Sequence, residues 1–299
     1  GLVGSEMCIR DSLCTEDLYG GTVRMFESIG EKRGVTFSYV DTSDIELVRK
    51  SIRKETKALY IETPSNPTMK VTDFAAMREI ADEYGLLIIA DNTFLTPYFQ
   101  KPLTLGADLV VHSGTKFLGG HNDVLAGFVC IKGKGLSEKL RYTYKTVGCC
   151  LPPFDSFLVL RGIKTLSVRL ERQQENAKKI ALWLKDRPEV KAVYYTGLPE
   201  HPGYEINQKQ ASGCGSMISF KVDSEKRARK LLESVKLISY AESLGGVESL
   251  ITYPMLQTHG DVPVETRERL GITEDFLRMS VGIENAEDLI ADLEQALAE

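Results

Sequence analysis

The sequence has no apolar stretch of membrane-spanning length and no run of basic residues. A transmembrane helix needs about 20 consecutive apolar residues, and nucleic-acid-binding surfaces are rich in Lys and Arg, so we expect neither a membrane nor a nucleic acid as partner. The six cysteines form no C-x-x-C pair and the four histidines are scattered, so no metal-binding motif is present. The phosphate-binding pattern G-x-x-x-x-G-K-[ST] is also missing, which argues against a P-loop enzyme.

The composition is that of an acidic globular enzyme. The 299 residues carry a net charge of -5 and are 42% hydrophobic, which is enough for one large domain and a smaller one. Cysteines without a pairing pattern indicate free thiols in a reducing compartment, so we expect a cytoplasmic location. Residues 1–12 lack the basic start and the apolar core of a signal peptide. They resemble a translated adaptor sequence, and we expect a non-native prefix, with a true N-terminal arm as the alternative.

From residue 35 onward, short apolar runs alternate with segments of helical periodicity. This alternation predicts an α/β fold with a parallel sheet and right-handed crossovers, and the continuous apolar runs indicate strands covered on both faces. In this first part we expect strands at 35–40, 58–61, 86–90, 108–111 and 124–131, and helices at 45–54 and 72–84.

A helical stretch over 154–187, in two pieces, marks the change of domain. We expect a large α/β domain over residues 13–170 and a small C-terminal α+β domain over residues 171–299. The elements predicted in the small domain are strands at 192–195, 216–222, 238–242 and 276–281, and helices at 224–235 and 286–298.

Polar residues follow three of the predicted strands where each strand ends: Asn66, then Asp91, then Ser113, Thr115 and Lys116. Open parallel sheets bind ligands outside the carboxyl ends of their strands. A buried aspartate needs a cation, and a protonated pyridine nitrogen is one. Together with hydroxyls for phosphate and a lysine for a Schiff base, it meets the needs of pyridoxal phosphate. Desolvation and nearby cations would lower the pKa of this lysine. Two other interpretations remain open here, namely Asp91 as a magnesium ligand and Lys116 as a solvated surface lysine.

A family resemblance narrows these interpretations. Residues 111–124, VHSGTKFLGGHNDV, resemble the signature of the cysteine/methionine-metabolism family of pyridoxal-phosphate enzymes, which includes cystathionine γ-synthase, cystathionine γ- and β-lyase and methionine γ-lyase. Further matches run in the family's order at 17–22, 62–67, 91–93, 160–166, 241–249 and 277–284. The resemblance covers residues 13–299. It implies a fold-type-I, aminotransferase-like architecture and pyridoxal 5'-phosphate as cofactor.

The resemblance implies cofactor-binding roles for six residues, of which Asn66 is also a candidate for substrate binding. Lys116 forms the Schiff base and moves the proton during catalysis, while Asp91 pairs with the pyridinium nitrogen. Tyr19 stacks on the ring and is a candidate base. Ser113 and Thr115 hold the phosphate.

Four residues are implied to bind the substrate. Arg278 clamps the α-carboxylate with its bidentate fork, and Ser243 helps there. Asn66 touches the ring hydroxyl or the substrate carboxylate. Glu242 lies where γ-synthases and γ-lyases carry an acid near the distal amine of cystathionine.

Two family features have no counterpart in the sequence: a phosphate-binding Gly-Met turn at a helix N-terminus, and a Tyr-x-Arg pair that reaches the neighbouring subunit's phosphate. Both would precede Asp17, so we expect an N-terminally truncated enzyme with weakened cofactor binding.

The resemblance also implies the reaction and the assembly. The expected substrates are sulfur amino acids or O-acylhomoserine, and the intact protein is expected to be a homotetramer built as a dimer of dimers. Glu242 favours chemistry at Cγ, with cystathionine γ-synthase as the preferred reaction. Cystathionine β- or γ-lyase and methionine γ-lyase are the alternatives, and a catalytically inactive fragment is an alternative of another class.

Overall fold

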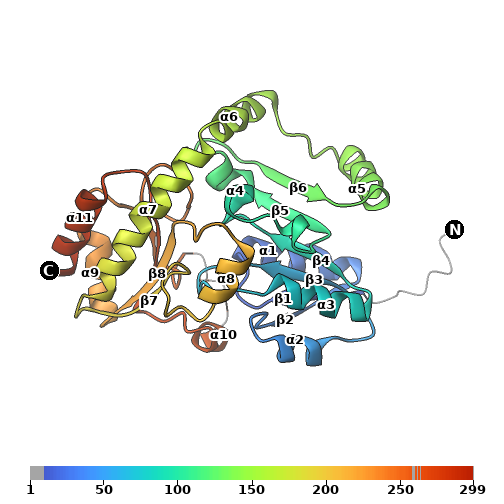
Figure 1. The fold of residues 1–299 in the computed structure, drawn as a ribbon, viewed down its shortest axis with the longest axis horizontal. Helices are drawn as coiled ribbons and strands as arrows, with labels where there is room; N and C mark the ends of the chain where they lie inside the picture. Colours follow the sequence, from blue (N-terminus) through green and yellow to red (C-terminus); the bar gives the residue numbers. More distant parts are fainter. Residues whose placement is uncertain (1–9, 258–259, 261, 263, 299) are drawn as a thin grey trace.

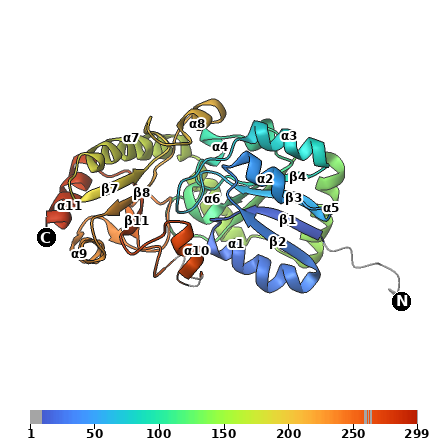
Figure 2. The ribbon, with the colours of Figure 1, turned by 90° about the horizontal axis from the view of Figure 1, so that it is seen from below.

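Two sheets organise the protein, whose computed structural model describes residues 10–257, 260, 262 and 264–298 (Figure 1). The first sheet has six strands in the order β2-β1-β3-β4-β5-β6, and the second has five in the order β7-β8-β11-β10-β9. The long helix α7 (Leu166–Lys185) leads from the first part of the chain to the second and lies along the second sheet (Figures 1 and 2). The domain boundary predicted at residues 170 and 171 falls within this helix.

The first sheet comprises β1 (Arg10–Thr15), β2 (Val35–Val40), β3 (Thr56–Glu62), β4 (Leu87–Asp91), β5 (Leu109–Ser113) and β6 (Gly127–Ile131). Strands β1 to β5 pair in parallel, as predicted. Strand β6 is antiparallel to β5, so the predicted parallel sheet has one antiparallel strand at its edge. The reason is that a parallel return needs a crossover, usually an α-helix. Only a short π-helical turn, η4 (Gly114–Leu118), lies in the segment between β5 and β6.

The helices and turns of the first part are α1 (Gly20–Met25), η1 (Phe26–Gly30), η2 (Glu31–Arg33), α2 (Ile45–Ser51), α3 (Phe74–Tyr84), α4 (Thr96–Phe99), η3 (Pro102–Thr104), α5 (Lys134–Val147) and α6 (Pro153–Ile163). Side-chain caps define two of them. Asp44 accepts the Leu47 N–H at the start of α2, and Asp73 accepts two amides at the start of α3, which therefore begins two residues later than predicted. Gly85, with φ +66°, ends α3.

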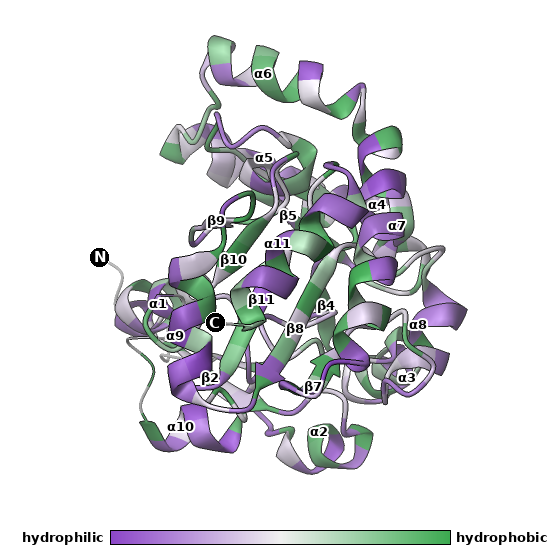
Figure 3. Ribbon diagram, turned by 90° about the vertical axis from the view of Figure 1, so that its left-hand side faces the viewer, coloured by the Kyte–Doolittle hydropathy of each residue, from purple (hydrophilic) through white to green (hydrophobic). Residues whose placement is uncertain are grey.

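The second sheet comprises β7 (Val190–Tyr194), β8 (Met217–Val222), β9 (Ser239–Tyr240), β10 (Leu250–Thr252) and β11 (Phe276–Ser280). Its helices are α8 (Tyr204–Gln210), α9 (Glu225–Ser234), α10 (Val264–Arg269) and α11 (Ala286–Ala298). Successive residues of a strand point to opposite faces, and in β11 this separates Leu277 and Met279 from Arg278. The two apolar residues join the core that the second sheet forms with α7, α9 and α11. In Figure 3, strands β8 and β10 of this sheet are largely green. Arg278 contacts Asn66 of the first part of the chain.

Strand β1 was not predicted, because its residues are mostly polar. Its Asp11 is buried and accepts hydrogen bonds from Ser38 at 3.0 Å and from Thr56 at 2.7 Å, on the two neighbouring strands. The strand begins inside the range that we predicted to be a non-native prefix, and residues 1–9 lie outside the described part. The sequence analysis also missed β10, α1, α4, α5, α8 and α10.

Among the described residues, none of the helices is both long and apolar enough to cross a bilayer. The same residues contain no group of three or more His, Cys, Asp or Glu side chains that could hold a metal ion.

Candidate active site

The carboxyl ends of β3 and β4 bring two acidic side chains side by side. The strand register pairs Glu62 with Asp91. Asp91 accepts the Thr93 N–H at 2.9 Å, and burial raises the pKa of its carboxyl above the ordinary value. Hydrogen bonds from Thr93 oppose this shift, and within the described residues no positively charged side chain does so. Asp91 is half-buried, and a carboxylate withdrawn from water with no cation nearby is costly, so this position fits a cationic group of a ligand.

Glu62 was quoted in a matching motif, but the sequence analysis assigned it no function. Its Oε2 atom accepts the Tyr19 N–H at 2.9 Å. Burial, followed by the neighbouring charge of Asp91, raises the pKa of Glu62 well above its usual range. The charge of its neighbour is thus among the causes that raise the pKa of Glu62, whereas burial is the one cause that raises the pKa of Asp91. An acidic residue at the end of an apolar run, beside a strand that also ends in an acid, is the signal that could have revealed it.

Lys116 lies in the π-helical turn η4 directly after β5. Its φ of -91° and ψ of -128° break the helical pattern inside the turn. The Nζ atom donates to Ser243 Oγ at 3.1 Å. Burial, and then the charge of Arg278, lower the pKa of Lys116, and Glu242 opposes them. A lowered pKa increases the fraction of neutral amine, which is the nucleophilic form.

Groups from later in the chain hold the segment that carries Lys116. Arg169 on α7 donates to Phe117 O at 2.9 Å and to Gly162 O at 3.0 Å. Gly245 packs against the segment from the other side, with φ +81°, and a Cβ there would lie 2.6 Å from Phe117 N. Only glycine fits this position without a rearrangement. The backbone around Lys116 is thus supported from two directions.

Arg278 is 1% exposed and makes its hydrogen bonds to neutral groups. One guanidinium nitrogen donates to Asn66 Oδ1 at 2.9 Å, and the other donates to Glu242 O at 2.8 Å and Thr252 Oγ1 at 3.0 Å. Burial lowers its pKa to about 10, so the group stays charged at neutral pH. In the described part of the chain, its Nε has no hydrogen-bond partner, and Glu242 and Glu62 oppose the lowering of its pKa through their charges. A buried guanidinium of this kind fits the carboxylate of a ligand.

The remaining predicted residues lie around this centre. Tyr19 is 47% exposed, and its ring covers Gly21, where a Cβ would lie 2.5 Å from Tyr19 Cε1. The Ser113 N–H donates to Thr93 Oγ1 at 2.9 Å. The Thr115 hydroxyl accepts the Ala126 N–H at 3.1 Å, so this side chain also fastens the loop before β6. Glu242 is exposed beside Lys116 and Arg278.

Comparisons with known proteins agree with this arrangement. The sequence profile of the Cys/Met metabolism PLP-dependent enzymes matches residues 9–298. The cystathionine gamma-lyase of Bacillus subtilis (strain 168) is 51% identical over 283 residues, which cover 95% of this chain and 75% of that protein. The cystathionine beta-lyase of Coxiella burnetii (strain RSA 493 / Nine Mile phase I) is 48% identical over 285 residues, covering 94% of this chain and 74% of that protein.

A solved structure extends the similarity to three dimensions. The cystathionine gamma-lyase from Lactobacillus plantarum, complexed with L-serine, superposes with a TM-score of 0.95 at 43% identity and covers 97% of this chain and 76% of that chain. The predicted fold-type-I architecture is confirmed, as are the pyridoxal-phosphate cofactor and the class of enzyme that forms or cleaves C–S bonds. The chain belongs to the Cys/Met metabolism family of PLP-dependent enzymes.

Proposed function

We propose that this chain acts at Cγ of a sulfur amino acid or an O-acylhomoserine, with Lys116 as the group that moves protons. The observation that carries the proposal is the position of Lys116, which has a lowered pKa and lies close to a buried Arg278 whose hydrogen bonds in the described residues go to neutral acceptors. A substrate α-carboxylate at Arg278 would place its Cα and Cγ near the lysine.

The described residues fit the cofactor. Asp91 would receive the pyridinium nitrogen, which supplies the positive charge that its half-buried carboxylate lacks. Lys116 would hold the aldehyde carbon, and Ser113 and Thr115 would hold the phosphate. Tyr19 would cover the ring. When bound, pyridoxal phosphate serves as an electron sink for negative charge that develops at the substrate Cα.

The chain's own residues would then perform the remaining steps. Arg278 binds the α-carboxylate, helped by Ser243 and oriented by Asn66. The neutral amine of Lys116 takes the proton from Cα and returns it at a neighbouring carbon. Ser243, whose hydroxyl accepts from Nζ at 3.1 Å, keeps the amine directed into the site. Glu242, exposed beside Lys116, is placed to receive a distal ammonium group of the substrate.

Product analysis tests the reaction. Purified protein with added pyridoxal phosphate is given cystathionine alone, or O-acylhomoserine together with cysteine. Cleavage at Cγ gives cysteine, 2-oxobutyrate and ammonia, and γ-replacement gives cystathionine; either result supports the proposal. Homocysteine and pyruvate without these products would overturn it in favour of β-lyase chemistry. The preference for γ-synthase stays a prediction, and its test is whether O-acylhomoserine with cysteine turns over faster than cystathionine alone.

Glu242→Gln is expected to weaken the binding of cystathionine. Because Glu242 is exposed, the lost ion pair is worth up to about 1 kcal/mol, so the KM for cystathionine should rise about three- to fivefold. O-acylhomoserine has no distal ammonium group, and its KM serves as the internal control. An equal rise for both substrates would show that Glu242 acts on the site as a whole and not on the distal amine.

The proposed assembly is a homotetramer. Helix α6 stands apart from the body of the molecule at the top of Figures 1 and 3, and its Phe154, Phe157 and Leu160 are 69%, 56% and 65% exposed. An exposed apolar face of this kind is typical of an interface. We expect light scattering to give a mass four times that of the 33.3 kDa chain.

A double substitution, Phe157→Glu with Leu160→Glu, is expected to lower this mass, whereas Leu237→Glu on the second part of the chain should leave it unchanged. A monomeric wild-type chain would contradict the proposed assembly.

A further inference from the structure

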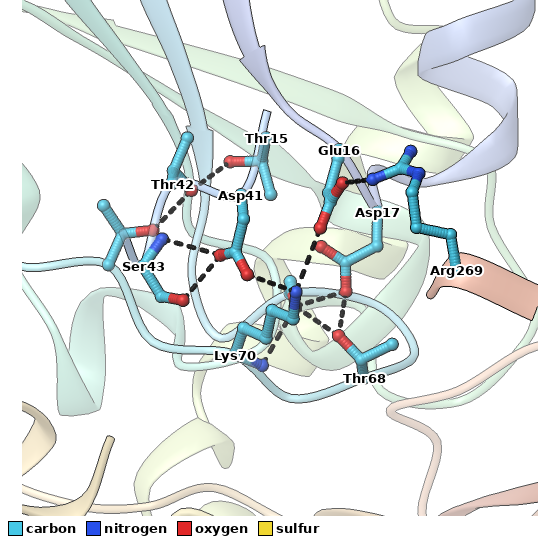
Figure 4. Close-up of polar contacts among 11 residues, drawn as sticks. Thr15, Glu16, Asp17, Asp41, Thr42, Ser43, Thr68, Lys70 and Arg269 are labelled. Atoms are coloured by element: carbon cyan, nitrogen blue, oxygen red, sulfur yellow. Dashed lines mark hydrogen bonds and ion pairs between the residues drawn. The ribbon is translucent and has the colours of Figure 1, made fainter. Parts of the chain in front are cut away.

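Asp17 is a buried carboxylate that joins two loops at the edge of the active site. It lies between β1 and α1 and is 1% exposed. Its Oδ2 atom accepts a hydrogen bond from Ser65 Oγ at 2.6 Å and a second one from the Thr68 hydroxyl, and Figure 4 shows the contact with Thr68. Its Oδ1 atom has no hydrogen-bond partner in the described part of the chain. All the directional bonding of this side chain is thus aimed at one loop.

That loop carries Asn66, which lies between the two hydroxyl residues. The loop is closed on itself, because Ser65 N–H donates to Lys70 O at 2.9 Å and Lys70 N–H donates to Ser65 Oγ at 3.0 Å. Ser65 is therefore fixed both by its own loop and by Asp17. Asn66 Oδ1 in turn accepts from Arg278 at 2.9 Å. A chain of contacts runs from Asp17 through the loop to the guanidinium of Arg278.

We propose that Asp17 is a positioning residue, which sets Asn66 against Arg278 and so orients the guanidinium for the substrate carboxylate. This inference rests on the proposed role of Arg278 in substrate binding. Asp17 itself need not touch the substrate or the cofactor. Tyr19 lies two residues further along the same segment, so the carboxylate also ties the segment that carries the tyrosine to the Asn66 loop.

Burial, hydrogen bonds and nearby charges together determine the pKa of Asp17. The charges of Lys70, Glu16 and Glu62 interact with Asp17. Asp41 and Arg269 do not act on it directly but pair with Lys70 and Glu16. Lys70 pairs with Glu16 at 3.0 Å and also with Asp41, and Arg269 of α10 pairs with Glu16 (Figure 4). Burial raises the pKa of Asp17 to about 6, while the Ser65 and Thr68 hydroxyls and Lys70 lower it and Glu16 raises it.

Protonation weakens the acceptor that holds the two hydroxyls. As the pH falls through about 6, Asp17 becomes neutral and its hydrogen bonds lose their charge assistance. The Asn66 loop should then loosen, and kcat/KM should fall through a higher KM. The fall of kcat/KM at acidic pH is the acid limb of the pH profile. Removing the Thr68 hydroxyl removes a contact that lowers the pKa of Asp17, so the acid limb should move to higher pH.

The first experiment needs neither cofactor nor substrate. Hydrogen exchange is compared between the wild-type chain and Asp17→Asn. The amides of Ser65, Met69 and Lys70 are hydrogen-bonded inside the loop and should exchange faster in the variant, while the amides of β4 should be unchanged. If loop exchange is unaltered in Asp17→Asn, the inference is overturned.

The second experiment measures kinetics across pH with pyridoxal phosphate bound. Asp17→Asn is expected to raise KM about 10-fold, as for hydrogen bonds to a charged group, with little change in kcat, and to abolish the acid limb. Thr68→Ala should shift the limb to higher pH, and the matched control Thr68→Ser, which keeps the hydroxyl, should leave it in place. Thr68→Ala also provides the test if Asp17→Asn does not fold.

The outcomes separate this inference from the proposed function. Faster loop exchange together with a higher KM and a moved limb supports it. Faster exchange with an unchanged KM would overturn it, because Asp17 would then hold the loop without serving the reaction. If the wild-type chain turned over no substrate, the proposed function would fail. The link between Asp17 and the loop would be rejected by a different result, namely unchanged hydrogen exchange in Asp17→Asn.

Discussion

Lys116→Ala is expected to abolish cofactor attachment and turnover together. Lys116 is half-buried in η4, directly after β5, and has a lowered pKa, and the variant loses both the nucleophile and the base. Proton transfer by one positioned group is worth about 10²–10⁴-fold, so residual turnover should lie at least that far below the wild type. Borohydride reduction of the wild-type chain with pyridoxal phosphate, followed by peptide mass spectrometry, should locate the cofactor on Lys116.

The matched control is Lys101→Ala, which removes an exposed lysine from the same part of the chain. It should retain the labelled Lys116 peptide and normal turnover. Cofactor found on another lysine of the wild-type chain, or turnover retained in Lys116→Ala, would contradict the assignment.

Asp91→Asn is expected to have the second largest effect. Removing one partner of a buried ion pair costs about 3–5 kcal/mol, so the loss of the carboxylate that faces the pyridinium should lower kcat/KM at least about 10²-fold. The measurement is steady-state kinetics at saturating pyridoxal phosphate, together with the cofactor concentration needed for half-maximal activity, which should rise.

The same substitution should act in the opposite direction on the cofactor-free chain. Burial raises the pKa of Asp91 in the folded state above its unfolded value, so the folded state binds the proton more tightly. The contribution of Asp91 to stability is therefore greatest at low pH, and it falls as the pH rises from the ordinary aspartate range through the higher folded pKa. Asparagine removes this loss. At about pH 8, the cofactor-free variant should unfold at a temperature equal to or above that of the wild type.

Glu62→Gln is the control for both measurements. Burial and the charge of Asp91 raise the pKa of Glu62, so its carboxyl takes up a proton more readily than an ordinary one, and glutamine keeps an oxygen that can accept the Tyr19 N–H. We expect kinetics close to the wild type. If Glu62→Gln lost as much activity as Asp91→Asn, the charge that faces the pyridinium would lie on Glu62.

Local patterns in the sequence were sufficient for most of the large sheet. Strands β3, β4 and β5 are continuous apolar runs, and the polar residues that follow them were correctly expected at one edge, because parallel strands share a direction. Asp44 and Gly85 mark helix ends through local backbone chemistry, which a sequence shows directly, whereas the cap at Asp73 was not recognised and α3 was predicted to begin two residues too early. Strand β1 was missed because its buried Asp11 is satisfied by residues of two other strands, and that burial is a tertiary property.

The site itself depended on information that no local pattern contains. Asn66 and Arg278 are 212 positions apart, and Lys116 and Ser243 are 127 apart, yet each pair is in hydrogen-bond contact. Periodicity cannot bring such residues together, and the family resemblance supplied the expectation that they act in one site. Glu62 and Asp17 received no role because an acid in a loop or at a strand end is normally solvated. Only the structure shows that both are buried.

The loop at residues 241–249 supplies backbone to both sides of the site: it accepts from Arg278 at Glu242 O, and its Gly245 packs on the segment of Lys116. The groups proposed to perform the chemistry come from the first part of the chain, whereas Arg278, Ser243 and Glu242, which are proposed to bind the substrate, come from the second; Asn66 is the exception. Substrate preference can therefore be altered by changes in the second half of the chain that leave the proton-transfer apparatus intact. Related enzymes that cut at different carbons can arise in this way from one common scaffold.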